Sequence, residues 1–174
     1  MRFAVTTTLT EQYREASTRN PVAGDGEMTI HIATIDDAPF MYEWRRDTDP
    51  DAGDGDYTRT QHEAWMTGML TDEKRVMLIG SLQDRPVGVM TLRDDNDALD
   101  VTIAMMSGER GKGLGTRMLA LASGTMQEYN LSAEIWRKNM FSLKLFRHAG
   151  FQPDTTKKNN GVTYWSRPAH MPKK

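Results

Sequence analysis

Residues 105–116 read Met-Met-Ser-Gly-Glu-Arg-Gly-Lys-Gly-Leu-Gly-Thr, and this stretch indicates the fold more strongly than any other part of the chain. It follows an alternating run at 99–104, which predicts a strand with two different faces. It leads into apolar residues at helical spacing over 114–129. A glycine-rich turn lets backbone N–H groups approach a ligand closely, and the N-terminus of a helix favours negative charge. The stretch therefore predicts a loop that binds phosphate groups.

Two common nucleotide-binding motifs do not fit this loop. A dinucleotide-binding fingerprint needs G-x-G-x-x-G, but after Gly111 and Gly113 the third glycine position holds Thr116. A Walker A loop needs G-x-x-x-x-G-K-[ST], and although Gly108 and Gly113 have the first spacing, Leu114 replaces the lysine. A domain that uses the loop for nucleotide phosphates alone is therefore a weaker interpretation.

The pattern that remains is R-x-x-G-x-G, formed by Arg110, Gly113 and Gly115. A second pattern, N-x-x-S-x-x-L-[YF]-x-x-x-G-F, follows at 139–151. With both patterns in this order, the sequence resembles the GCN5-related N-acetyltransferase (GNAT) family over roughly residues 29–165. The resemblance implies a mixed α/β fold, with a central, twisted, mostly antiparallel sheet flanked by about four helices.

The resemblance also implies that acetyl-CoA is a co-substrate and that no metal takes part. The loop amides would hold the coenzyme diphosphate, the preceding strand would pair with the pantetheine arm, and Asn139 would contact that arm. The implied coenzyme-binding residues are Ile103, Ala104, Met105, Arg110, Gly111, Lys112, Gly113, Leu114, Gly115, Thr116, Asn139 and Ser142. Asn139 is equally suited to capping a helix, and the two roles are compatible. Lys112, Arg117 and Lys138 could reach the outer phosphate, or could be solvated surface charges.

The expected reaction is direct attack of a neutral amine on the thioester in a ternary complex. Many family members place a tyrosine where this chain has Phe146, which has no proton to give. Tyr164, Tyr42 or a water would then protonate the departing thiolate, or the thiolate leaves unassisted; Tyr164 could instead be a packing residue. Asp100 is the leading candidate for a general base, with Glu134 as a weaker choice, although a solvated carboxylate on the strand is the alternative for Asp100.

The sequence leaves the acceptor amine open. Arg45 and Arg46 could bind a substrate phosphate. The pattern His62-x-x-Trp65 resembles members that act on nucleotide-linked amino sugars and, more loosely, on protein N-termini. The acidic stretch 47–56 could instead attract a cationic amine. A non-catalytic acyl-CoA-binding or interaction protein with the same fold is the alternative that the phenylalanine described above keeps open.

Length and composition set the remaining expectations. The 174 residues suit one domain, expected at 28–168, with a loosely attached arm and linker at 1–27 that holds one short helix, and a tail at 169–174. The chain has no cysteine, which excludes disulfides and a cysteine nucleophile. A net charge of −2 gives no reason to expect a nucleic-acid or membrane partner. We expect a cytoplasmic monomer or homodimer.

Overall fold

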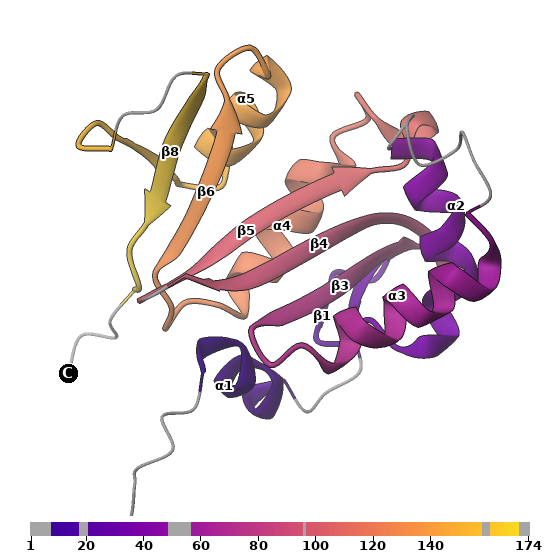
Figure 1. The fold of residues 1–174 in the computed structure, drawn as a ribbon. Helices are drawn as coiled ribbons and strands as arrows, with labels where there is room; N and C mark the ends of the chain where they lie inside the picture. The colour runs from indigo at the N-terminus through magenta and orange to yellow at the C-terminus, as the bar shows by residue number, and fades with distance from the viewer. Residues whose placement is uncertain (1–7, 18–20, 49–56, 96, 158–160, 171–174) are drawn as a thin grey trace, which may run out of the picture.

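The computed structural model describes residues 8–17, 21–48, 57–95, 97–157 and 161–170. Figure 1 shows its elements, which in chain order are α1 (Leu9–Ala16), β1 (Ala23–Gly24), β2 (Met28–Ile32), η1 (Ile35–Asp37), α2 (Ala38–Thr48), α3 (Arg59–Thr71), β3 (Arg75–Leu82), β4 (Arg85–Asp95), β5 (Ala98–Met105), η3 (Ser107–Glu109), α4 (Leu114–Gly124), β6 (Leu131–Trp136), α5 (Met140–His148), β7 (Gln152–Asp154) and β8 (Val162–Arg167). Most of the acidic stretch, residues 49–56, lies outside the described residues.

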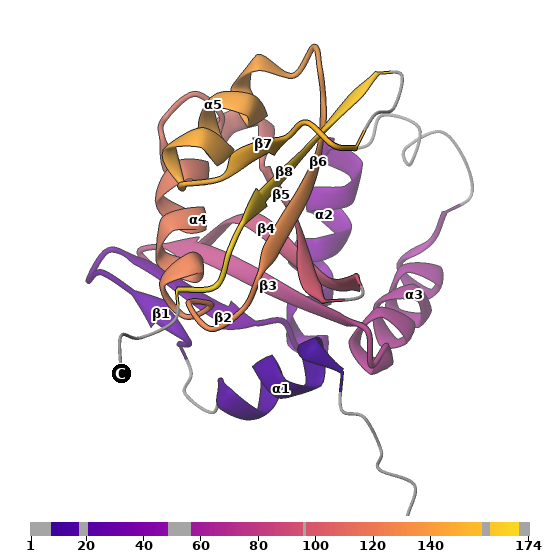
Figure 2. The same ribbon diagram turned by 90° about the vertical axis from the view of Figure 1, so that its left-hand side faces the viewer.

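The strands form one sheet in the order β1-β2-β3-β4-β5-β6-β8-β7. Every neighbouring pair is antiparallel except β5 and β6, which are parallel. Helices α2 and α3 cover one face, while α4 and α5 cover the other, as Figures 1 and 2 show. The expected mixed, mostly antiparallel sheet with helices on its faces is therefore confirmed, with five α-helices in the described part of the chain.

The two faces of the sheet each bury an apolar layer, and β3 shows why. Val76 and Leu78 belong to the core cluster beneath α4, whereas Met77 and Ile79 belong to the cluster beneath α2 and α3. Because successive side chains of a strand point to opposite faces, a strand buried on both sides must be apolar at nearly every position. None of the helices within the described ranges is long and apolar enough to cross a membrane.

Helix α1 packs into the domain, which corrects the expectation of a loosely attached arm. Tyr13 is fully buried in the same core cluster as α4. Its hydroxyl lies 2.9 Å from that of Thr125, and its ring meets Tyr129 edge-on at 6.1 Å. The short helix itself was expected, but the composition of the arm did not show that one of its aromatic residues completes the core.

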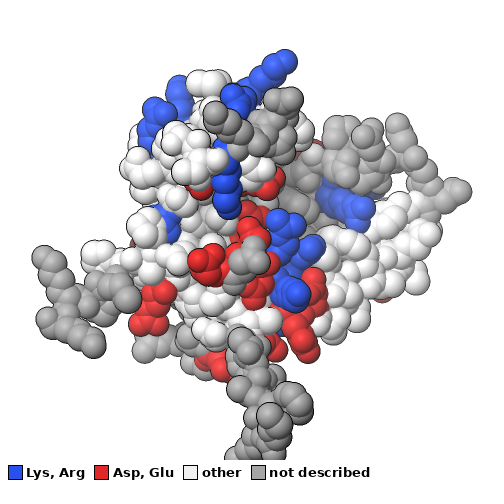
Figure 3. Space-filling view, turned by 60° about the vertical axis from the view of Figure 1, so that its left-hand side comes forward, with Lys and Arg blue, Asp and Glu red and all other residues white. Residues whose placement is uncertain are grey.

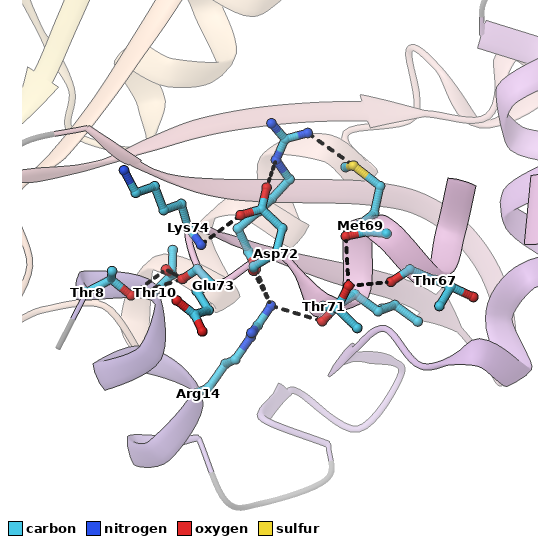
Figure 4. A network of polar contacts seen from close by, with 12 residues as sticks. Thr8, Thr10, Arg14, Thr67, Met69, Thr71, Asp72, Glu73 and Lys74 are labelled. Atoms are coloured by element: carbon cyan, nitrogen blue, oxygen red, sulfur yellow. Dashed lines mark hydrogen bonds and ion pairs between the residues drawn. The ribbon is translucent and has the colours of Figure 1, made fainter. Parts of the chain in front are cut away.

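Polar contacts fasten α1 to the connection between α3 and β3, as Figure 4 shows. The hydroxyls of Thr8 and Thr10 donate to the carbonyl of Glu73 at 2.9 and 2.5 Å. The guanidinium of Arg14 donates to the carbonyl of Asp72 at 3.1 Å and also reaches that of Leu70, in the last turn of α3. A cation beside the free carbonyls at the end of a helix is favourable, so α1 stabilises the end of α3.

Replacing Tyr13 should therefore destabilise the whole domain. Tyr13→Ala is expected to lower the free energy of unfolding by about 3–5 kcal/mol, because it empties a large buried site. Tyr13→Phe should cost only about 1 kcal/mol, since it removes one hydrogen bond and keeps the ring. Urea unfolding of the two variants measures both values. Equal stability of wild type and Tyr13→Ala would show that α1 is attached only loosely.

Candidate coenzyme and acceptor site

Strands β5 and β6 part along most of their length. β5 pairs with β4 from Ala98 to Met105, but with β6 only at Leu99–Leu131 and Asp100–Ser132. Beyond these two pairs β6 no longer pairs with β5, and Figure 1 shows the two backbones diverging. We call the region between these diverging backbones the slot; its closed end is the Asp100–Ser132 pair.

The backbone of β5 offers unpaired groups to the slot. The N–H of Leu99 donates to the backbone carbonyl of Asn130 at 2.9 Å, on the β6 side of the strand. Backbone groups along a strand point alternately to its two sides, so those of Val101, Ile103 and Met105 also point toward β6. Past Val101 no described strand pairs with them, although the carbonyl of Met105 accepts a hydrogen bond from Nε of Arg110 at 3.2 Å.

Ala104 differs from its two neighbours. Its backbone groups point toward β4, and its carbonyl also accepts a hydrogen bond from Nε1 of Trp44 at 3.3 Å. Of the three residues expected to pair with a pantetheine arm, Ile103 and Met105 therefore face the slot with their backbone, and Ala104 does not. The bond from Trp44 instead places the last turns of α2 against the end of β5.

The glycine loop leads from the open end of the slot into α4. Gly111 and Gly113 have φ angles of 76° and 77°, in the left-handed region that favours glycine. A Cβ atom at either position would meet no described atom within 4 Å, so the space beside them is open. Gly113 is the N-cap of α4, and no side chain in the described part of the chain caps this helix. The first N–H groups of α4, from Leu114 onward, are therefore available to an anion.

Gly115 serves a different purpose. A Cβ atom there would approach Cδ1 of Leu145 to 3.0 Å and Cγ of Met105 to 3.4 Å. The glycine lets the start of α4 pack closely against α5 and the end of β5. Gly115 and Leu145 come from the two sequence patterns, which this contact brings together.

Ion pairs and hydrogen bonds fix the residues that lead from β5 into the glycine loop. Glu109 accepts from Arg85 at 2.8 Å and from Lys112 at 3.2 Å, and these two cations lower the pKa of its carboxyl group. Asp47, in the last turn of α2, accepts from the N–H and the hydroxyl of Ser107, both at 2.5 Å. These bonds lower the pKa of Asp47. The loop is thus fastened both to the sheet and to α2.

Asp100 lies at the closed end of the slot. It is 7% exposed, and its carboxylate pairs with Arg93 of β4 at 3.2 Å. Burial raises the pKa of Asp100; Arg93 opposes this effect, while the negative charges of Glu134 and Asp95 reinforce it. A carboxylate with a raised pKa is a stronger base than an exposed one, which suits it to accept a proton.

A model of the acetyltransferase (GNAT) family matches residues 38–151, more than half of the chain. The chain belongs to this family. Among curated protein sequences, none matches this GNAT chain.

Solved structures of acetyltransferases share the fold of this GNAT chain at low sequence identity. RimL, a ribosomal L7/L12 α-N-protein acetyltransferase in complex with coenzyme A, has a TM-score of 0.71 and 12% identity over 84% of this chain and 96% of its own. The aminoglycoside acetyltransferase AAC(6')-Ib, in complex with coenzyme A, has a TM-score of 0.64 and 16% identity over 81% of this chain and 94% of its own. Spermidine N-acetyltransferase from Vibrio cholerae has a TM-score of 0.64 and 13% identity over 83% of this chain and 95% of its own.

Phe146, at the position where many family members have a tyrosine, and Tyr164, a candidate proton donor, both lie apart from the closed end of the slot. Phe146 is 4% exposed and packs edge-on against Phe151 at 5.0 Å, so it is a core residue. Tyr164 lies opposite Glu134 on β8, two strands away from Asp100. With about 4.8 Å between adjacent strands, Tyr164 is about 10 Å or more from the β5 backbone.

Tyr42, the other tyrosine considered as a proton donor, is part of a ring cluster between α2 and α3. Its hydroxyl donates to the carbonyl of Tyr57 at 3.2 Å, and its ring stacks on that of Tyr57 at 6.3 Å. It also meets the ring of His62 edge-on at 5.4 Å.

Several cations of this GNAT chain already have partners. Arg117 makes two hydrogen bonds with Asp25, at 2.6 and 2.7 Å, and a third contact with Glu27 at 3.0 Å. This arginine is therefore committed to the turn before β2, and the expectation that it reaches the coenzyme phosphate is not supported. Lys112 is held by Glu109, while Lys138 is exposed beside the start of α5.

Asn139 caps α5, because its side-chain oxygen accepts from the N–H of Ser142 at 3.0 Å. The expected cap is thus confirmed. The cap leaves the amide NH₂ group of Asn139 available for another partner.

Arg45 is held by aromatic rings. Its guanidinium lies 4.7 Å from the ring centre of Tyr57 and 5.0 Å from that of Trp65, and it donates to the hydroxyl of Tyr57 at 3.0 Å. The same hydroxyl lies 3.3 Å from Nδ1 of His62. Burial, followed by the charge of Arg45, lowers the pKa of His62, which favours the neutral form of this histidine. No local sequence pattern connects Tyr57 to Arg45, because only the fold brings this tyrosine beside α2.

Proposed function

We propose that this chain transfers an acetyl group from acetyl-CoA to a primary amine, by direct attack in a ternary complex. The main support is the slot, where the backbone of Ile103 and the N–H of Met105 face no described strand, and which leads to the N-terminus of α4, where no side-chain cap is described. Solved structures of the same fold hold coenzyme A, which supports this ligand for the slot.

In the proposed complex the diphosphate binds the amides of the loop from Arg110 to Thr116. The pantetheine arm lies in the slot and pairs with the backbone of Ile103 and Met105, in place of the missing strand. Asn139 and Ser142, at the start of α5, lie on the other side of the diverging strands and would contact the arm. The thioester then lies toward the closed end, because the arm runs back from the loop along β5.

The chemistry follows from that placement. An N–H of the β5 edge donates to the thioester oxygen and stabilises the negative charge that develops there. Asp100 accepts the proton of the attacking amine as the C–N bond forms, and the C–S bond then breaks to release the thiolate. Holding the two reactants in the right geometry contributes much of the rate enhancement. Asp100 thus has the catalytic role in this proposal, and Tyr164 does not, because it lies two strands away.

The acceptor would enter from the face covered by α2 and α3, since Asp100 points to that face together with its neighbour Arg93. Figure 3 shows acidic and basic side chains side by side in the middle of the visible surface, so neither sign dominates there. This mixture favours an amine that also carries an anionic group, such as a nucleotide-linked amino sugar or the N-terminus of a protein. Related folds acetylate a protein N-terminus, an aminoglycoside or spermidine.

A panel of amines with acetyl-CoA tests the proposal. Release of free thiol should be saturable in both substrates for at least one of four classes: amino-sugar nucleotides, N-terminal peptides, aminoglycosides and polyamines. Calorimetry with coenzyme A alone measures binding separately. Saturable coenzyme binding without thiol release for any class would instead favour the non-catalytic acyl-CoA-binding alternative.

A further inference from the structure

Among the described residues, Ser132 is one of four with a buried side-chain polar atom that has no hydrogen-bond partner. Its hydroxyl oxygen is buried and makes no hydrogen bond within the part of the chain that the structure describes. Buried hydroxyl groups normally have a partner, so one without a partner needs an explanation, and a catalytic role is one such explanation.

Ser132 lies at the closed end of the slot. It is the strand partner of Asp100 in the last pair before β5 and β6 part. Its neighbours Leu131 and Ala133 are buried in the core beneath α4, so Ser132 points to the opposite face. Asp100 points to that face too, because its neighbours Leu99 and Val101 on β5 are buried in the core beneath α4. The hydroxyl and the carboxylate therefore lie side by side, on strands about 4.8 Å apart.

The proposed coenzyme would end at this place. From Met105 to Val101 the strand spans about 13 Å at 3.3 Å per residue. An extended arm that starts at the glycine loop runs along this length and stops where β6 closes the slot. The thioester sulfur is then next to the pair formed by Asp100 and Ser132.

A proton donor is needed at this position. The departing thiolate takes up one proton, and the attacking amine gives one to Asp100. Phe146 has no proton to give, and Tyr164 lies two strands away. Ser132 has a hydroxyl beside the protonated base and is not committed to another partner among the described residues.

We propose that Ser132 relays the proton from Asp100 to the coenzyme thiolate. This inference rests on the proposed acetyl transfer. As the C–S bond breaks, the hydroxyl of Ser132 donates its proton to sulfur and takes the proton that Asp100 received from the amine. The net change is the transfer of one proton from amine to thiolate, and both side chains return to their starting states.

Single-turnover acetyl transfer tests the relay, with acetyl-CoA and the amine that the panel identifies, so that wild-type turnover is already established. Ser132→Ala should lower the rate by about 10- to 100-fold, because it removes a proton donor. Affinity for coenzyme A should stay within about twofold, and Ser132→Thr, which keeps the hydroxyl, should restore most of the rate. Ser166→Ala is the matched control, since Ser166 is the strand partner of Ser132 on β8 and takes no part in the relay.

The solvent isotope effect distinguishes a relay from a structural role. Two protons move together in the relay. For the wild type, a plot of the rate against the fraction of D₂O in the solvent should therefore be curved. For Ser132→Ala the same plot should be linear. An undiminished rate in Ser132→Ala, an unchanged curve, or an equal loss in Ser132→Ala and Ser132→Thr would each overturn the relay while leaving the proposed acetyl transfer in place.

Discussion

Gly113→Asp is expected to lower the affinity for coenzyme A by at least about 100-fold, which corresponds to about 2.8 kcal/mol. Gly113 is the N-cap of α4, with φ of 77°, and the space beside it is open. A carboxylate placed there competes with the diphosphate for the N–H groups at the start of α4 and repels its charge. Calorimetric titration with coenzyme A measures the loss.

Two control variants isolate the cause of this loss. Gly113→Ala adds only the backbone strain of a left-handed residue, about 1–2 kcal/mol, without a charge. Gly124→Asp adds the same carboxylate at the other end of α4, where a Cβ atom also meets nothing within 4 Å. It should leave the affinity nearly unchanged. If Gly113→Asp binds coenzyme A as tightly as Gly124→Asp does, the loop is not the diphosphate site.

Asp100→Asn should lower kcat/KM at neutral pH by about 100- to 10,000-fold, the range expected for loss of a general base. Asparagine keeps the size of the side chain but cannot accept the proton. In the wild type, the rate should fall with decreasing pH as Asp100 becomes protonated. Because the pKa of Asp100 is raised, this fall should begin above the ordinary aspartate value of 3.8. In the variant that acidic limb should disappear.

The effect of Asp100 on stability has the opposite sign to its effect on rate. Its pKa is raised in the folded chain, so between 3.8 and the raised value the folded state binds more protons than the unfolded state. The free energy of unfolding therefore falls as pH rises through that window, and the buried charge remains a cost at neutral pH. Asp100→Asn should consequently unfold no more easily than the wild type in urea. A variant with lost activity and much lower stability would point to a structural role for Asp100.

Much of the proposed coenzyme site could be predicted from local sequence. The glycines of the loop are needed because of their own backbone angles, and Asn139 caps the residues that directly follow it. Such features depend on residues within one turn of chain, and spacing alone therefore reveals them. The same reasoning identified Asp100 as a polar residue in a strand, but gave no account of its burial, because that depends on the neighbouring strands β4 and β6.

The surroundings of a side chain that contacts distant parts of the chain could not be predicted from local sequence. Arg117 looked like a cation available to a phosphate, yet it pairs with Asp25, 92 residues earlier. Tyr13 lay in a polar N-terminal stretch, yet its ring fills the core beside Tyr129. In both cases the side chain is engaged by a partner that no local pattern connects to it.

The sequence by itself determined the order of elements, the glycine loop and the family, because helix starts, strand alternation and left-handed glycines are local properties of the chain. The tertiary structure alone decided where β5 and β6 part and which backbone groups of β5 are left unpaired. It also placed Ser132 beside Asp100 with its hydroxyl unpartnered among the described residues. The register between two strands depends on how both faces of the sheet pack against the helices. Because these contacts join distant parts of the chain, no single segment of sequence predicts the register.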